Sequence, residues 1–161
     1  MGRPLAIIDW EFATAKGGRG VNGDMAQFLA SLHLLLLSLR KPNSRDSVSP
    51  VYETVATFQR WVCDAYAYLK LFHISRSPGN PIMWLLRSAL ILHGREMINQ
   101  AVEREWITEG LSVSEMVRAG AWYLERAGED VEDMLEEGNW EELTREDHGV
   151  ILRLFHFRSG R

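Results

Sequence analysis

The segment from Asp24 to about Arg40 restricts what this chain can fold into more than any other stretch. Its apolar residues recur at spacings of three and four, which places them on one broad face of an α-helix: Met25, Phe28, Leu29, Leu32, Leu35, Leu36 and Leu39. Asn22-Gly23-Asp24 supplies turn and capping chemistry at the start, and Lys41-Pro42-Asn43 breaks the pattern at the end. We expect a central core helix that Asp24 caps.

Two more helices are predicted by a cap followed by proline, which suits the first helical position. Ser49 and Pro50 open the first, whose apolar positions are Val55, Phe58, Val62, Ala65, Tyr66 and Leu69. Asn80 and Pro81 open the second, which runs toward Trp106.

The last third of the chain begins with a capping box, Ser112-Val113-Ser114-Glu115, which predicts a helix through Trp122 and Leu124. The stretch 125–147 then holds half of the 22 acidic residues and is expected to form short helices separated by Gly128 and Gly138. We expect Thr144 and Asp147 to cap a final helix through Phe155. After it come the basic residues His156, Arg158 and Arg161.

Composition sets the class of protein. A chain of 161 residues with 46% hydrophobic content can bury one core, so we expect one helical domain over 1–161. A net charge of -4 argues against nucleic-acid binding. The longest apolar run, 25–39, is too short and too interrupted to cross a membrane. With a single cysteine, Cys63, and no signal-peptide pattern, a soluble cytoplasmic protein is expected.

The one stretch that carries recognisable chemistry lies near the N-terminus. Leu5-Ala6-Ile7-Ile8 reads as a short buried strand, and Asp9 stands where that strand gives way to the Gly-rich loop Lys16-Gly17-Gly18-Arg19-Gly20. A carboxylate in this place can face a metal ion. The alternative is a strand-end carboxylate that caps a local turn.

The segments Ile8-Asp9-Trp10-Glu11 and Asp24-Met25-Ala26 resemble the "I-D-W-E" and "D-L-A" motifs of the aminoglycoside phosphotransferase and choline kinase-like family. A third stretch, Gly94-Arg95-Glu96-Met97-Ile98 through Trp106, resembles a C-terminal helix of fungal members. The resemblance implies a mainly α fold, a partial protein kinase-like C-terminal lobe with a short N-terminal β-strand or hairpin. It also implies ATP and Mg2+ as cofactors, with Asp9 as the metal ligand and Asp24 bracing the catalytic loop.

This chain departs from the family pattern in what it lacks. Only eight residues precede Asp9, so the phosphate-binding lysine and the catalytic Asp-Asn loop have no place before it, and no His-x-Asp-x-x-x-x-Asn pattern follows. We therefore expect a truncated phosphotransferase-like protein that is not competent alone and has no catalytic residue of its own. Two alternatives stay open: a non-catalytic binding or scaffold module, and a helical pocket repurposed for other small-molecule chemistry.

The strand expected at 5–8 also predicts a partner chain. If 5–8 has no neighbouring strand upstream, its edge needs a cover, so we expect a homodimer, a swapped element or a separate partner chain. A small-molecule ligand is also expected. If the family groove persists, acidic residues along it suit a cationic amine.

Other polar and aromatic residues have simpler explanations. Glu129, Asp130, Asp133 and Glu137 have helical spacing for a cation but are expected to form a solvated face. His93 and Glu96 lack a second histidine at metal-binding spacing and are expected on the surface or in a groove, whereas His33 is expected in the core. Cys63 lacks an activating pattern. The tryptophans at 61, 84, 106 and 122 are expected to be buried, and those at 10 and 140 to meet solvent or ligand.

Overall fold

The computed structural model describes residues 20–40, 49–68, 73–74, 81–103, 112–129, 133 and 150–157. Four α-helices dominate this part of the chain, α1 (Gly20–Leu39), α2 (Pro50–Tyr68), α3 (Pro81–Glu103) and α4 (Val113–Gly128). A 3₁₀ helix, η2 (Ile151–Leu154), and two short strands, β1 (His73–Ile74) and β2 (His156–Phe157), complete the order. The mainly α prediction is confirmed. The predicted strand at 5–8 lies outside the described residues.

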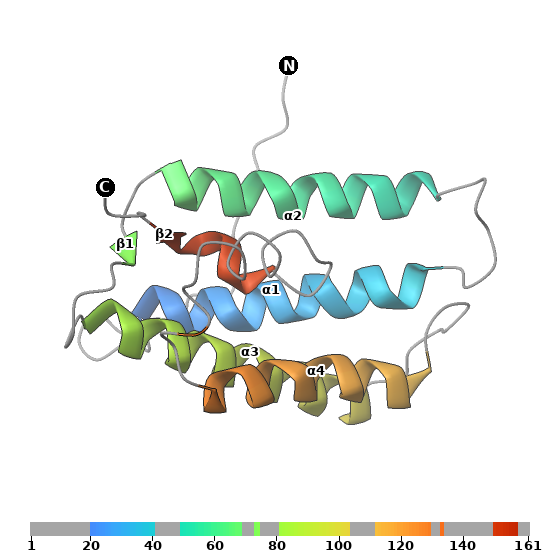
Figure 1. Ribbon diagram of the computed structural model, residues 1–161. Coiled ribbons are helices and arrows are strands. Elements are labelled where there is room, and N and C mark those ends of the chain that lie inside the picture. The colour runs from blue at the N-terminus through green and yellow to red at the C-terminus, as the bar shows by residue number, and fades with distance from the viewer. Residues whose placement is uncertain are drawn as a thin grey trace, which may run out of the picture.

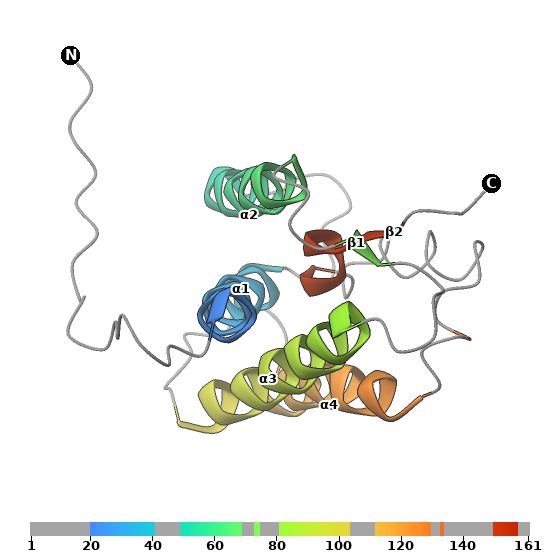
Figure 2. The ribbon, with the colours of Figure 1, turned by 90° about the vertical axis from the view of Figure 1, so that its left-hand side faces the viewer.

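The helices are arranged in layers around α1. Seen along the helix axes, α1 lies between α2 and α3, and α4 packs against α3 (Figures 1 and 2). The 3₁₀ helix contacts both α2 and α3, and so fills part of the space between them. The core therefore has α1 at its centre, as predicted. Its buried apolar side chains come from all four α-helices and from the segment 150–155.

Helix α1 begins at Gly20, four residues before the start expected from the sequence. Asp24 therefore lies inside the helix, on its exposed side, and the prediction that Asp24 caps this helix is wrong. The deeply buried face contains small residues, Ala26 and Ala30, beside Leu29 and Leu34, while Phe28 is exposed. Because two alanines bring neighbouring backbones close, a helix placed at the centre of the core can be buried on more than one side.

The predicted caps of two helices are confirmed. The hydroxyl of Ser49 accepts a hydrogen bond from the backbone N–H of Val51 at 3.3 Å, at the start of α2. At the start of α4, the backbone N–H of Ser112 donates to Glu115 Oε2 at 2.7 Å, as a capping box requires. Asn80, the cap expected for α3, lies outside the described residues.

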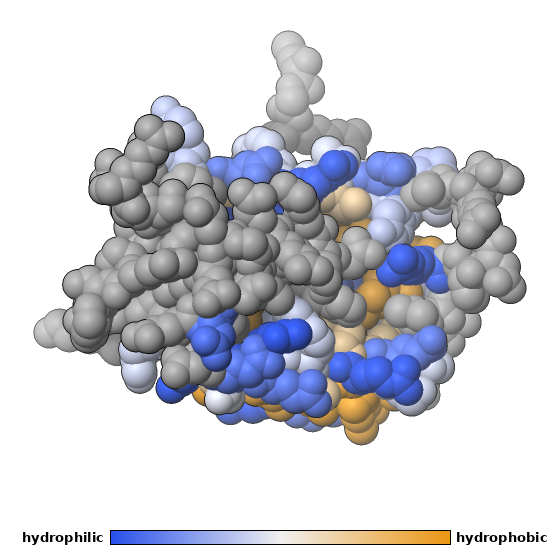
Figure 3. Space-filling model, viewed as in Figure 1, coloured by the Kyte–Doolittle hydropathy of each residue, from blue (hydrophilic) through white to orange (hydrophobic). Residues whose placement is uncertain are grey.

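Helix α2 buries only part of the face expected from its apolar residues: Val62 is buried and Tyr66 packs against the core, as predicted. Gln59, Val62 and Cys63 are buried, whereas Phe58 and Trp61 are exposed. The side of α2 that lines the space between α1 and η2 carries polar residues, among them Glu53, Gln59 and Arg60, so apolar residues alone did not identify the buried face. In the space-filling view, hydrophobic surface appears between α2 and α4, on the side away from the β1–β2 pair (Figure 3).

The end of the chain differs from the predicted final helix. The described residues there form the 3₁₀ helix, which ends at Leu154, and then β2, whose His156 and Phe157 pair in parallel with His73 and Ile74 of β1. His156 therefore belongs to a strand, and the prediction that it joins a basic tail is wrong. The predicted caps Thr144 and Asp147 lie outside the described residues. None of the helices described here is long and apolar enough to span a membrane.

Candidate functional site

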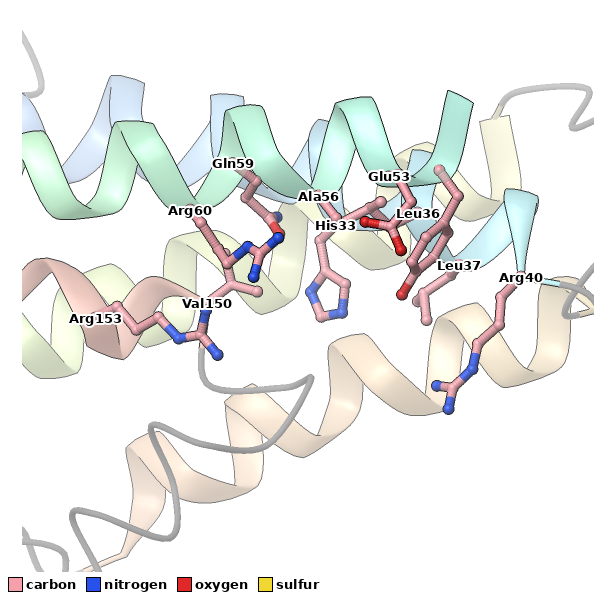
Figure 4. A pocket seen from close by; sticks show the side chains of 11 residues that line it. His33, Leu36, Leu37, Arg40, Glu53, Ala56, Gln59, Arg60, Val150 and Arg153 are labelled. Carbon is pink, nitrogen blue, oxygen red and sulfur yellow. The ribbon is translucent and has the colours of Figure 1, made fainter. Parts of the chain in front are cut away.

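A pocket lies between α1, α2 and the 3₁₀ helix, with a volume of about 350 Å³ (Figure 4). Its wall is formed by three residues of α1, the residue that follows this helix, five residues of α2 and two near the C-terminus: His33, Leu36, Leu37, Arg40, Tyr52, Glu53, Ala56, Gln59, Arg60, Val150 and Arg153. Pockets of several hundred Å³ take small organic molecules. The size is therefore that of a ligand site.

The spacing of these residues follows from the two helices. On α1 they recur at 33, 36 and 37, with Arg40 just after the helix, and on α2 at 52, 53, 56, 59 and 60, which is one face of each helix. The apolar part of the wall comes mainly from α1, while α2 contributes most of the polar groups. A ligand in this space would meet both.

The pocket lining carries more positively than negatively charged side chains. Three of the lining residues are arginines, Arg40 at the end of α1, Arg60 on α2 and Arg153 on the 3₁₀ helix, against one carboxylate, Glu53. Arginine guanidinium groups stay protonated and donate paired N–H groups to carboxylate and phosphate oxygens. The lining is therefore rich in donors for an anion.

Gln59 is the most unusual residue of the pocket, because its side chain is polar and only 6% exposed. Among the residues that the structure describes, nothing accepts a hydrogen bond from its Nε2. A buried donor without an acceptor costs about 1–3 kcal/mol, so such groups usually serve a purpose.

A cluster of three buried side chains adjoins the pocket. His33 from α1, His93 from α3 and Tyr123 from α4 meet in the core, where each is at most 2% exposed. His93 Nε2 lies 3.5 Å from His33 Nδ1, and the Tyr123 hydroxyl lies 3.4 Å from the same His33 atom. Since His33 also lines the pocket, it joins the pocket to the cluster.

The proton on His93 can be assigned from its partner. Its Nδ1 lies 3.0 Å from the Ala26 carbonyl oxygen, which only accepts, so we assign the proton to Nδ1. Burial lowers the pKa of His93 to about 3, against a smaller opposing effect of that hydrogen bond. Burial likewise raises the pKa of Tyr123 well above its ordinary value. The imidazole of His93 and the phenol of Tyr123 are therefore neutral at pH 7.

Cys63 of α2 lies in the core and is 1% exposed. Its thiol donates to the Val150 carbonyl oxygen at 3.6 Å, and burial raises the pKa of the thiol to about 11, although nearby Arg153 acts in the opposite direction. Because nucleophilic cysteines need a lowered pKa and access to solvent, Cys63 has a structural role. This agrees with the lack of an activating pattern in the sequence.

The residues expected to carry a metal or a reaction are located as follows. Asp9 lies outside the described residues. Asp24 is exposed on α1, and no described residue donates a hydrogen bond to its carboxylate. Within the described part of the chain, no three His, Cys, Asp or Glu side chains are grouped so that they would hold a metal ion. Of the acidic run, Glu129 and Asp133 are described, and both are exposed, as expected for a solvated face.

The prediction for His93 is wrong, and that for His33 is confirmed. His93 is fully buried rather than on the surface, because its Nδ1 donates to the carbonyl of the neighbouring helix α1. Glu96, one turn along α3, is half-buried, and its Oε1 accepts from Gln100 at 2.7 Å and from Gln27 at 3.2 Å. The pair His93 and Glu96 therefore does not form a ligand site.

Two of the tryptophans also differ from the prediction. Trp61 is 66% exposed and Trp84 is 68% exposed, although both were expected in the core. Trp122 is partly buried against the core, as expected, and its ring centroid lies 5.0 Å from that of Tyr123. Trp10, Trp106 and Trp140 lie outside the described residues.

The pocket itself was not predicted from the sequence. The signal that could have indicated it is Gln59-Arg60, a polar pair between the apolar residues Phe58 and Trp61 of α2. A polar residue at a position that helical spacing directs toward the core suggests a polar wall. Arg153, separated from this pair by most of the chain, gave no comparable signal.

Comparison of the chain with protein-family models, curated proteins and solved structures gives no match.

Proposed function

We propose that this chain is the C-terminal lobe of a kinase-like phosphotransferase of the aminoglycoside phosphotransferase and choline kinase-like type. Ile8-Asp9-Trp10-Glu11 followed by Asp24-Met25-Ala26 carries the proposal. The second segment lies in α1, where Ala26 is fully buried and helps to fix the helix in the core. Asp24 is exposed, which suits a residue whose role is to brace a catalytic loop.

In this proposal Asp9 is the magnesium position. Its carboxylate supplies the oxygen donor that Mg2+ prefers, and the phosphates of ATP share the ion, since one carboxylate alone binds magnesium weakly. Bound magnesium would neutralise charge on the phosphates. The contribution of this chain is to hold Asp9 at the end of a strand that leads into the core helix.

Phosphoryl transfer in this family needs a lysine on the phosphates and a catalytic loop with an Asp base and an Asn metal ligand. The His-x-Asp-x-x-x-x-Asn pattern of that loop does not occur in residues 1–161. The proposal is therefore that the chain does not transfer phosphate by itself, and that a nucleotide-binding lobe from outside these residues completes the site. The proposal also includes a second copy or a partner chain that pairs with the expected strand at 5–8. A monomer by light scattering at high concentration would count against that pairing.

A second function, a non-catalytic module that binds a small molecule, is favoured by one observation. The pocket between α1 and α2 has a buried donor, Gln59 Nε2, and three arginines, and none of these belongs to the phosphotransferase pattern. The two functions use different residues, so they can be tested separately.

The first function is tested by calorimetric titration of the chain with ATP and Mg2+. We expect weak binding that Asp9→Asn abolishes. Asp64→Asn, which removes an exposed carboxylate from α2, should leave it unchanged. Absence of binding in a chain with a normal helical circular dichroism spectrum would contradict the proposal.

A further inference from the structure

The pocket between α1 and α2 holds a hydrogen-bond donor in need of an acceptor. Gln59 is buried, its side chain lines the pocket, and its Nε2 donates to none of the described residues. Figure 4 shows this side chain running from α2 into the space beside His33. A ligand oxygen placed here would accept the hydrogen bond that the described residues leave unmade.

Positive charge lies around the same point. Arg60 follows Gln59 on α2, and Arg153 enters the space from the 3₁₀ helix (Figure 4). The guanidinium of Arg60 makes a long contact, 3.4 Å, with the Thr57 hydroxyl on its own helix. Two guanidinium groups and an amide donor together suit an oxyanion, which accepts several charge-assisted hydrogen bonds at once.

The rest of the pocket limits the shape of the ligand. Its volume of about 350 Å³ exceeds what a bare inorganic anion needs. Leu36, Leu37 and Ala56 supply apolar wall. Glu53 also lines the pocket, more than one helical turn from Gln59, and its carboxylate disfavours a second anionic group at that end.

We propose that this pocket binds a small organic anion, with one carboxylate or phosphate group held by Gln59, Arg60 and Arg153 and an apolar body against α1. Carboxylic acids and phosphate monoesters share this chemistry, and the experiment below distinguishes them. The site uses no residue before Gly20, so it does not depend on Asp9 or on nucleotide binding.

The test is a titration of the full chain followed by nuclear magnetic resonance of the side-chain amide of Gln59. The probes are benzoate and phenyl phosphate, with neutral benzyl alcohol, cationic benzylamine and inorganic phosphate for comparison. We expect the Gln59 amide resonance to shift with benzoate, phenyl phosphate or both. Tighter binding of benzoate identifies a carboxylic acid as the ligand class, and tighter binding of phenyl phosphate identifies a phosphate monoester.

Variants assign the binding to named groups. Gln59→Met keeps the volume but removes the donor, and Arg60→Gln removes the charge. Each should weaken binding of the organic anion about tenfold or more. Arg118→Gln removes an exposed arginine from α4 and should change nothing. Circular dichroism verifies that each variant is folded.

Three results would overturn the proposal. The first is that no anionic probe shifts the Gln59 resonance. The second is that benzyl alcohol binds as tightly as benzoate, or inorganic phosphate as tightly as phenyl phosphate. The third is that Arg118→Gln weakens binding as much as Arg60→Gln, which would indicate only a general effect of net charge.

Discussion

Gly94 of α3 and Gly120 of α4 face each other where the two helices pack together. A Cβ atom on Gly94 would lie 2.6 Å from the Gly120 carbonyl oxygen, and one on Gly120 would lie 2.9 Å from the Gly94 carbonyl oxygen. Both distances are shorter than non-bonded atoms allow, so this contact requires glycine at both positions. The close approach positions Tyr123 of α4 beside His93 of α3, with 4.5 Å between ring centroids.

We predict that Gly94→Ala destabilises the protein although alanine favours helix. Alanine in a helix interior gains about 1 kcal/mol over glycine. Here the added methyl group meets backbone, which cannot rotate away, and overpacking of this kind costs about 1–3 kcal/mol. Urea unfolding should show a net loss. The control is Gly128→Ala, because no described residue lies within 4 Å of a Cβ at Gly128, the last residue of α4. Equal stability of the two variants would contradict the close contact.

We predict that stability falls as the pH is lowered through the range from about 6.5 to about 3. Burial lowers the pKa of His93 to about 3 in the folded state, whereas the pKa of a solvent-exposed histidine is 6.5. Between these values the unfolded state binds the proton and the folded state does not, so acid favours unfolding. One such proton contributes about 1.4 kcal/mol per pH unit.

The measurement is the free energy of unfolding by urea at several values of pH between 4 and 7. His93→Gln keeps a donor for the Ala26 carbonyl and does not titrate, so its slope against pH should be smaller by about one proton. An unchanged slope in His93→Gln would show that other groups cause the acid sensitivity.

We predict that Cys63 resists alkylation in the folded protein. Its thiol is 1% exposed, and burial raises its pKa to about 11, so at pH 8 it is protonated and inaccessible. Iodoacetamide should react at the rate of unfolding, and quickly in urea. The raised pKa also makes the free energy of unfolding depend on pH. The stability contributed by the protonated thiol is fully present below about pH 9 and is lost as the pH rises through about 11. Rapid modification under native conditions would contradict the burial of Cys63.

We predict that Gln100 matters more to stability than Gln27, although both bridge α1 and α3. Gln100 is 5% exposed, and its Nε2 donates to Ser31 Oγ at 2.8 Å and to Glu96 Oε1 at 2.7 Å. Gln100→Leu leaves those acceptors without this donor and should cost about 1–3 kcal/mol. Gln27 is exposed, and Gln27→Leu should change stability by less than about 0.5 kcal/mol. Urea unfolding of both variants provides the comparison. A larger loss of stability in Gln27→Leu than in Gln100→Leu would contradict the prediction.

The features that the sequence predicted well are local ones. Ser49 and the Ser112 to Glu115 capping box mark helix starts because each side chain bonds to backbone two or three residues away. The start of α1 was misjudged at Asp24, since Gly20 precedes it without any cap signal. Helix α2 was placed with Phe58 inward, because apolar residues were assumed to be buried.

Long-range contacts were not predictable in the same way. His33 and His93 are 60 residues apart, and their contact depends on how α1 and α3 pack. The pocket needs Gln59 on α2 and Arg153 near the C-terminus to meet, which no spacing in the sequence indicates. The motif at Asp9 is the reverse case: its resemblance to a family motif predicts a metal-binding role, and the described residues do not include it.

The proposed magnesium position at Asp9 is tested most directly by Mn2+ in place of Mg2+, since manganese takes the same oxygen ligands and broadens nearby resonances. The indole resonance of Trp10, assigned with Trp10→Phe, serves as the reporter beside Asp9. With ATP and Mn2+, we predict that this resonance broadens, and that Asp9→Asn abolishes the broadening in a folded chain. A Trp10 resonance that stays sharp, or one that broadens equally in Asp9→Asn, would contradict the account.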